Sequence, residues 1–130
     1  VAPATTFGAS QTNVGTPGSG ASSTTNVGTD ETSGTGYTSG GFTLTNVNPD
    51  SSGTTAKTSF SANPSWSGAS FSTTAAIIYN NSTRLGAAAT PLNGRAVSVH
   101  DFGGTQTVTA GTFTLVLPTN DASNAILRIA

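Results

Sequence analysis

The chain has 130 residues, enough for one domain, and only 7% of them are charged, against about 25% in an ordinary soluble domain. A net charge of −1 without any basic run excludes the electrostatic pattern of a nucleic-acid-binding protein, and no apolar stretch approaches the roughly 18 residues that span a bilayer. The absence of cysteine excludes disulfides and thiolate metal sites. We therefore expect no nucleic acid and no membrane among the partners of this chain.

The first 36 residues predict an extended N-terminal arm rather than part of a globular domain. Their larger apolar residues are only Val1, Phe7, Val14 and Val27, and Gly, Ser and Thr fill most of the other positions. Such a segment buries too little surface to offset the entropy lost when it becomes ordered. We expect residues 1–36 to lie along a partner, with Phe7, Val14 and Val27 as apolar anchors.

The remaining residues, 37–130, carry the alternation of apolar and polar residues that predicts β-strands. Strands are expected over residues 42–47, 57–62, 66–80, 95–102, 105–110, 113–117 and 125–129. Gly, Pro, Asn and Asp mark the turns between them, and Glu, Lys, Gln and Arg are too few to favour helices. This spacing predicts an all-β fold, either an antiparallel sandwich or a small barrel, with few or no helices.

The core of this β-domain is expected to be thin, because large apolar residues are scarce. Residues 75–79 form an apolar run that is typical of a strand buried on both faces. The predicted core residues are Trp66, Ile77, Phe113, Leu115 and Leu117. A domain that buries so little often completes its core with a partner.

Titratable side chains are too few to indicate an active site. His100 is the only histidine, and its neighbour Asp101 would point to the opposite face of a strand, so we interpret His100 as structural. One histidine cannot form a zinc site, and the acidic pair Asp30 and Glu31 lacks the spacing of a metal-binding loop. The sequence therefore predicts no catalytic residue, no metal site and no cofactor, and a protein that is not an enzyme.

Three strings in the C-terminal part carry a family resemblance. They are Ala76-Ile77-Ile78-Tyr79, then Asp101-Phe102-Gly103-Gly104 followed by Ala110-Gly111-Thr112-Phe113-Thr114, and finally Ile126-Leu127-Arg128-Ile129-Ala130. Over residues 75–130 the chain resembles a group of small virion proteins of tailed bacteriophages. The resemblance implies that Asp101 and Phe102 lead into a tight turn in which Gly103 and Gly104 supply positive φ.

Within that group, the resemblance implies a capsid decoration, or cement, protein on the surface of the virion. Such a protein is not an enzyme; it binds the assembled head shell and stabilises it by mass action. Its partners would be the major capsid protein or other virion proteins, and it would form a homotrimer. The arm, residues 1–36, lies outside the resemblance.

Two other functions fit the sequence. A tail, neck or fibre protein would use Tyr37, Trp66 and Tyr79 to stack on host glycans, although a thin core favours burial of the single Trp. A secreted module that binds ice or a polysaccharide would use threonine ladders such as the one over residues 105–109. The β propensity of threonine also explains these ladders without any ligand.

Overall fold

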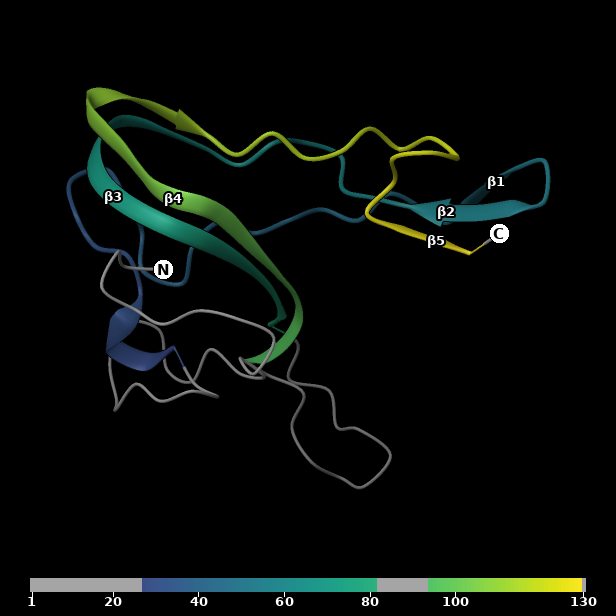
Figure 1. The fold of residues 1–130 in the computed structure, drawn as a ribbon, viewed down its shortest axis with the longest axis horizontal. Coiled ribbons are helices and arrows are strands. Elements are labelled where there is room, and N and C mark those ends of the chain that lie inside the picture. Colours follow the sequence, from purple (N-terminus) through teal and green to yellow (C-terminus); the bar gives the residue numbers. More distant parts are fainter. Residues whose placement is uncertain (1–26, 82–93, 130) are drawn as a thin grey trace. The chain divides into compact units, whose positions relative to one another are not determined.

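The computed structural model of the chain describes residues 27–81 and 94–129 (Figure 1). In this part of the chain the only helical element is one turn of 3-10 helix, η1 (Gly28–Asp30). The strands are β1 (Asp50–Ser52), β2 (Thr55–Thr58), β3 (Ser65–Asn80), β4 (Arg95–Thr114) and β5 (Leu127–Ile129). They form two antiparallel sheets, with strand orders β1-β2-β5 and β3-β4, so the predicted all-β antiparallel fold is confirmed.

The described residues belong to two compact units. Unit 1 contains residues 27–40, 68–81 and 94–111, and unit 2 contains residues 41–67 and 112–129. Most of β3 and β4 belongs to unit 1, and the sheet β1-β2-β5 belongs to unit 2. Each unit is described by itself below.

Unit 1 has its core on one face of β3. Its buried apolar side chains are Val27, Ala69, Phe71, Ala75 and Ile78. Three of them alternate along β3, because successive side chains of a strand point to opposite faces. The ring of Phe71 also packs edge-on against that of Tyr37, with centroids 5.5 Å apart.

The described end of the predicted arm is part of this core. Val27 is only 5% exposed, so its side chain is not available to a partner, and its assignment as an anchor is corrected. Phe7 and Val14 lie outside the described residues. Thr32 and Thr35 bond to β3, so the contact of the chain with β3 starts ahead of the boundary expected at residue 36.

Residues 32–35 reach β3 by pairing with one of its edges. Ser70 donates its backbone N–H to the carbonyl of Thr35 (2.9 Å), and the two residues form an antiparallel bridge. Gly34 permits this approach, because a Cβ at that position would lie 2.4 Å from the carbonyl oxygen of Ser70. The local sequence gives no periodic signal for such long-range pairing, which explains why residues 27–36 were expected to be an arm.

The predicted core residue Ile77 is half-buried, and its neighbour Ile78 is the buried one. Strict alternation from Ala69, Phe71 and Ala75 would place Ile77 on the buried face, so burial of Ile78 shows that the alternation shifts by one position after Ala75. The other predicted core residues, Trp66, Phe113, Leu115 and Leu117, belong to unit 2 and are also half-buried.

Unit 2 contains an aromatic cluster. Trp66 packs against Phe42 and Phe113, each with a centroid separation of 6.0 Å. As predicted, the half-buried Phe113, Leu115 and Leu117 share one face, while Val116 between them is exposed. The predicted core face is therefore present, but among the described residues of unit 2 only Pro64 and Ala125 are buried apolar residues.

Some observed strand boundaries match the predicted ones and others differ. The strand expected over residues 66–80 matches β3 closely, and the strand expected over residues 125–129 is shortened to β5. Residues 42–47 form no strand; only Asn46 makes an isolated bridge, to Phe60. Between the strands expected over residues 42–47 and 57–62, β1 and β2 form a hairpin closed by Gly53 (φ 60°) and Thr54.

The predicted turn at Asp101, Phe102, Gly103 and Gly104 is wrong, because all four residues lie inside β4. The carboxylate of Asp101 accepts the backbone N–H of Gly103 (2.9 Å), and Gly103 has the predicted positive φ of 71°, whereas Gly104 does not. A strand can contain a single residue with a left-handed backbone as a β-bulge, without reversing its direction. The chain therefore continues along β4 instead of reversing.

Candidate interaction surfaces

The only histidine lies on the exposed part of β4. His100 Nε2 is 2.9 Å from the hydroxyl of Ser98, two residues earlier on the same face. Asp101 directs its carboxylate to the backbone of Gly103 instead. The structure thus brings a serine to the histidine and gives Asp101 a backbone role, and the structural role of His100 stays a prediction.

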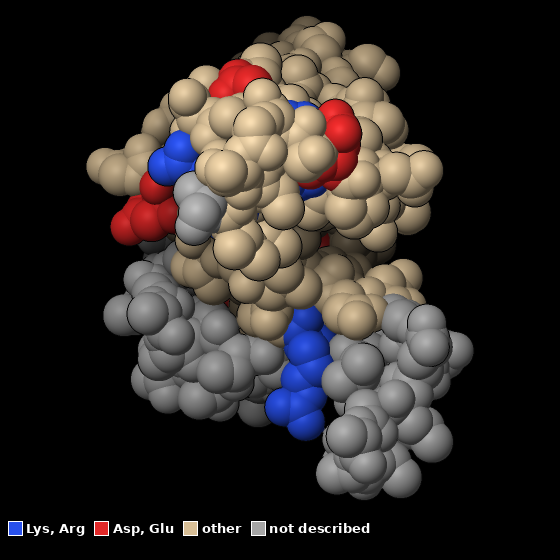
Figure 2. All heavy atoms as spheres, turned by 90° about the vertical axis from the view of Figure 1, so that its right-hand side faces the viewer, with Lys and Arg blue, Asp and Glu red and all other residues tan. Residues whose placement is uncertain are grey.

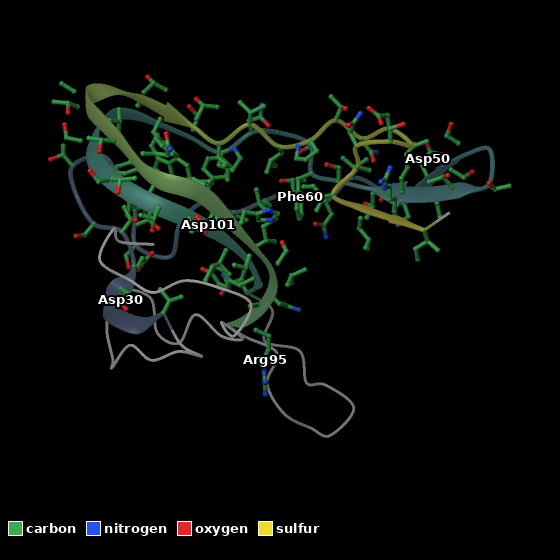
Figure 3. All side chains as sticks on the ribbon, in the orientation of Figure 1. Asp30, Asp50, Phe60, Arg95 and Asp101 are labelled. Carbon is green, nitrogen blue, oxygen red and sulfur yellow. The ribbon has the colours of Figure 1, made fainter. Side chains whose placement is uncertain are left out.

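The acidic residues are distributed over separate elements. Figure 3 labels Asp30, Asp50 and Asp101, which belong to η1, β1 and β4. Within residues 27–81 and 94–129, no group of three or more His, Cys, Asp or Glu side chains is arranged to hold a metal ion. Figure 2 shows the charged side chains as a few isolated spots on a surface of uncharged residues.

A hydrogen-bonded cluster around Glu31 fastens residues 31–40 to β3 in unit 1. The carboxylate of Glu31 accepts the hydroxyls of Tyr37 and Ser39 (both 2.9 Å) and the backbone N–H of Gly40 (2.6 Å). Tyr79, on β3, donates its hydroxyl to the carbonyl of Gly40 (2.7 Å). Both tyrosines that were candidates for stacking on glycans therefore use their hydroxyls inside the unit.

The same cluster raises the pKa values of both tyrosines. Burial is the main cause of the raised pKa of Tyr37, and the negative charge of Glu31 adds to it. The pKa of Tyr79 is raised for the same two reasons. Both phenols are therefore held in the neutral form that donates a hydrogen bond.

In unit 2, a single carboxylate organises the loop before β5. Asp121 accepts the hydroxyl of Thr119 (2.6 Å) and the backbone N–H groups of Ser123 and Asn124 (2.8 Å each). Hydrogen bonds to its carboxylate hold the pKa of Asp121 well below its usual range, and the bond from the Thr119 hydroxyl contributes most. Arg128 of β5 donates to the carbonyls of Ala122 and Ser123 in the same loop, so this polar network is structural.

The sheet of unit 2 carries its charged residues on one face. On one face, Lys57 of β2 lies directly opposite Asp50 of β1 and Arg128 of β5 in the strand register. Lys57 is only 9% exposed and forms an ion pair of 3.0 Å with Asp50. A buried lysine needs such a partner, because removing its charge from water is costly. Lys57, on the central strand, is therefore the buried residue of this row, whereas Asp50 (69% exposed) and Arg128 on the outer strands are exposed.

The opposite face of that sheet exposes apolar side chains. Leu127 and Ile129 of β5 are 58% and 70% exposed, and both point away from the Lys57 face because strand residues alternate. Ala56 lies opposite Ile129 in the register and is exposed as well. The other exposed large apolar residues in the described part of the chain are Phe42, Val97 and Val116, and of these only Val97 belongs to unit 1.

The threonine ladder of β4 faces a matching row of hydroxyls on β3. Thr107 Oγ1 lies 2.8 Å from the Ser72 hydroxyl, and Ser70 Oγ accepts the backbone N–H of Ala110 (2.9 Å). Thr105, Thr107 and Thr109 are all exposed. The sequence revealed the ladder on β4 but not its register with β3, which pairs residues more than thirty positions apart.

Comparison with known proteins assigns no family to the chain: no family model, no curated protein and no solved structure gives a match. The stretches that the structure describes also contain no helix of the length and apolarity needed to span a bilayer. The resemblance to phage virion proteins remains a prediction from residues 75–130. A function is proposed below from the geometry of the surfaces.

Proposed function

We propose that this protein is a non-enzymatic structural component of a tailed-phage virion, of the capsid decoration type. In this role it binds the assembled head shell at the capsid surface, and its partner is the major capsid protein or another virion protein. Because it binds only the assembled form, it raises the free energy needed to take the shell apart.

The observation that carries the proposal is the exposed apolar face of the sheet in unit 2. Leu127 and Ile129 leave most of their apolar surface in water, on the face of the sheet opposite to Lys57. Burying a large aliphatic side chain contributes about 1.5 to 3 kcal/mol, so an exposed apolar face represents binding energy that is not used within the unit. Contiguous exposed apolar surface typically marks a protein–protein contact.

The sparse charge supports the same role. Exposed strand edges normally carry charges that prevent pairing with other chains. Here β5 carries one, Arg128, and its guanidinium is turned to the carbonyls of Ala122 and Ser123. A protein that is displayed in many copies on a regular shell also gains from multivalent attachment, so each contact can be modest.

The test is binding of the purified chain to undecorated phage head shells, measured by co-sedimentation. Leu127→Ser and Ile129→Ser should each weaken binding about tenfold or more, because each removes most of a buried aliphatic contact. Val97→Ser is the matched control, since Val97 is equally exposed (70%) but lies in unit 1, and its binding should be unchanged.

Equal binding by all three variants would exclude the apolar face of unit 2 as the contact. No binding to shells, with binding to purified tails, would replace the decoration role by the tail or fibre role. Circular dichroism of each variant verifies the fold, and the exposure of all three positions makes unfolding an unexpected outcome.

A further inference from the structure

The two outer edges of the β3-β4 sheet are treated differently by the chain. The outer edge of β3 is covered by residues 32–35, through the bond from Ser70 to Thr35. Among the described residues, no strand pairs with the outer edge of β4. A two-stranded sheet is marginal by itself, and an uncovered edge is a template for another strand.

The backbone groups of β3 reveal which residues of β4 face that open edge. Ser70 directs its N–H to Thr35, and Ser72 directs its carbonyl to the hydroxyl of Thr32 (3.4 Å), both on the side away from β4. Alternate residues of a strand direct their backbone groups to the same side. Ser70 and Ser72 therefore do not bond to β4 through the backbone.

In an antiparallel pair of strands, some directly opposed residues exchange backbone hydrogen bonds and others do not. The side chains of opposed residues without backbone hydrogen bonds lie closer together. The hydroxyl oxygens of Ser72 and Thr107 are 2.8 Å apart, which fits this relation. In that register the N–H and C=O of Thr107 point away from β3. The same holds for Thr105 and Thr109, which precede and follow it by two positions in the strand.

The open part of the edge is short, regular and uncharged. Residues 104–109 read Gly-Thr-Gln-Thr-Val-Thr, without a charge or a proline. Gly103 (φ 71°) and Ala110 (φ 47°) interrupt the regular strand on either side. Such a segment has the β propensity and low charge of sequences that add to other strands, and it lacks the lysine or proline that usually blocks an edge.

We propose that residues 105–109 of β4 pair antiparallel with the same residues of a second copy of this chain, about a two-fold axis at Thr107. In this register Thr107 faces its own copy and Thr105 faces Thr109 of the other copy. About six backbone hydrogen bonds form across the axis. Threonine pairs are favourable across strands, and Asp101, the nearest charge, meets no like charge.

This inference stands independently of the virion role, because it rests on β4 alone. It gives an even number of copies, whereas the resemblance to decoration proteins implies a trimer. The mass in solution therefore decides between these two assemblies. Shell binding through unit 2 is a separate measurement, so failure of one proposal does not imply failure of the other.

The first experiment is light scattering on the purified chain and on two variants at Thr107. The unsubstituted chain and Thr107→Ser, which keeps the backbone N–H, should have twice the mass of one chain. Thr107→Pro removes an outward N–H without removing a bond to β3, so its dimer dissociation constant should rise about tenfold or more. A monomer or a trimer for the unsubstituted chain, or an undiminished Thr107→Pro dimer, overturns the proposal.

The second experiment tests the register and does not depend on the proline variant. The chain contains no cysteine, so each substitution introduces a single thiol. Under mild oxidation, Thr107→Cys should form a disulfide dimer, and a mixture of Thr105→Cys with Thr109→Cys should cross-link more than either alone. Thr43→Cys, an exposed threonine in unit 2, is the matched control. Equal cross-linking at all positions contradicts the pairing.

Discussion

Unit 1 and unit 2 differ in where they place their apolar side chains. Unit 1 buries five of them and holds residues 31–40 in place with the Glu31 cluster. Among its described residues, unit 2 buries only the small apolar residues Pro64 and Ala125 and leaves Leu127 and Ile129 exposed. The comparison indicates that unit 1 is stabilised mainly by its own contacts, whereas unit 2 has apolar surface left for a partner.

The largest expected effect comes from shortening the chain. Removal of residues 1–36 should unfold unit 1, because it deletes buried Val27, the Glu31 carboxylate and the pairing of Thr35 with β3. Removal of residues 1–26 keeps all of these contacts and should leave the unit folded. Hydrogen exchange of the β3 amides in both truncations is the measurement, and equal protection would contradict the assignment of residues 27–36 to the core.

The single tryptophan makes this experiment selective for one unit. Trp66 belongs to unit 2, where it packs on Phe42 and Phe113. Its fluorescence should therefore stay native in the shorter chain that lacks residues 1–36. A simultaneous loss of both signals would show that the two units fold as one, and the comparison between them would then fail.

Two substitutions of phenylalanine by alanine, one in each unit, compare how much an aromatic ring stabilises each core. Phe71→Ala should cost about 3 kcal/mol or more, because it leaves a cavity in the buried core of unit 1. Phe113→Ala should cost about half as much, because Phe113 is half-buried and its neighbours remain partly in water. Urea unfolding of both variants gives the two values, and equal losses would remove the distinction between the cores.

The Glu31 cluster makes the stability of unit 1 fall in alkaline solution. The raised pKa of Tyr37 means that the folded state holds the phenolic proton more tightly than the unfolded state. The contribution of Tyr37 to the unfolding free energy is complete below the pKa of an unfolded tyrosine, about 10, and is lost progressively as the pH rises above that value. Unfolding free energies from about pH 8 to about pH 11 should therefore decrease.

The control for this alkaline loss is Tyr37→Phe, which cannot ionise at position 37. It should be less stable at neutral pH by about 1 kcal/mol, since the bond to Glu31 is lost, and should depend less on pH. Tyr79, whose pKa is also raised, accounts for the dependence that remains. An identical pH profile for the variant would exclude Tyr37 as the titrating group.

The parts of the fold that were predicted correctly are those with a local signal. The long strand over residues 66–80 follows from its apolar run and from the turn residues that bound it, and the alternation of Phe113, Leu115 and Leu117 follows from period two. The absence of good helix formers was enough to predict the all-β class.

The parts that were missed depend on partners far away in the sequence. Glu31 and Tyr79 meet at Gly40 because residues 31–40 return to β3, and no local pattern encodes that return. Gly103 looks like a turn residue, but whether a left-handed glycine reverses a strand or forms a bulge is decided by the neighbouring strand. The ion pair of the buried Lys57 likewise depends on the register that places it opposite Asp50.

The smallest expected effect is local and has the opposite sign. Ala110 is the one described non-glycine residue with positive φ (47°), a conformation that costs an alanine about 1 to 2 kcal/mol. Ala110→Gly relieves that strain and should raise the unfolding free energy by about 0.5 to 1 kcal/mol after the entropic cost of glycine. Ala96→Gly, at a half-buried position of β4 without positive φ, should lower it by a similar amount. Since the two substitutions are chemically identical, destabilisation by both would show that the left-handed backbone at residue 110 does not strain the strand.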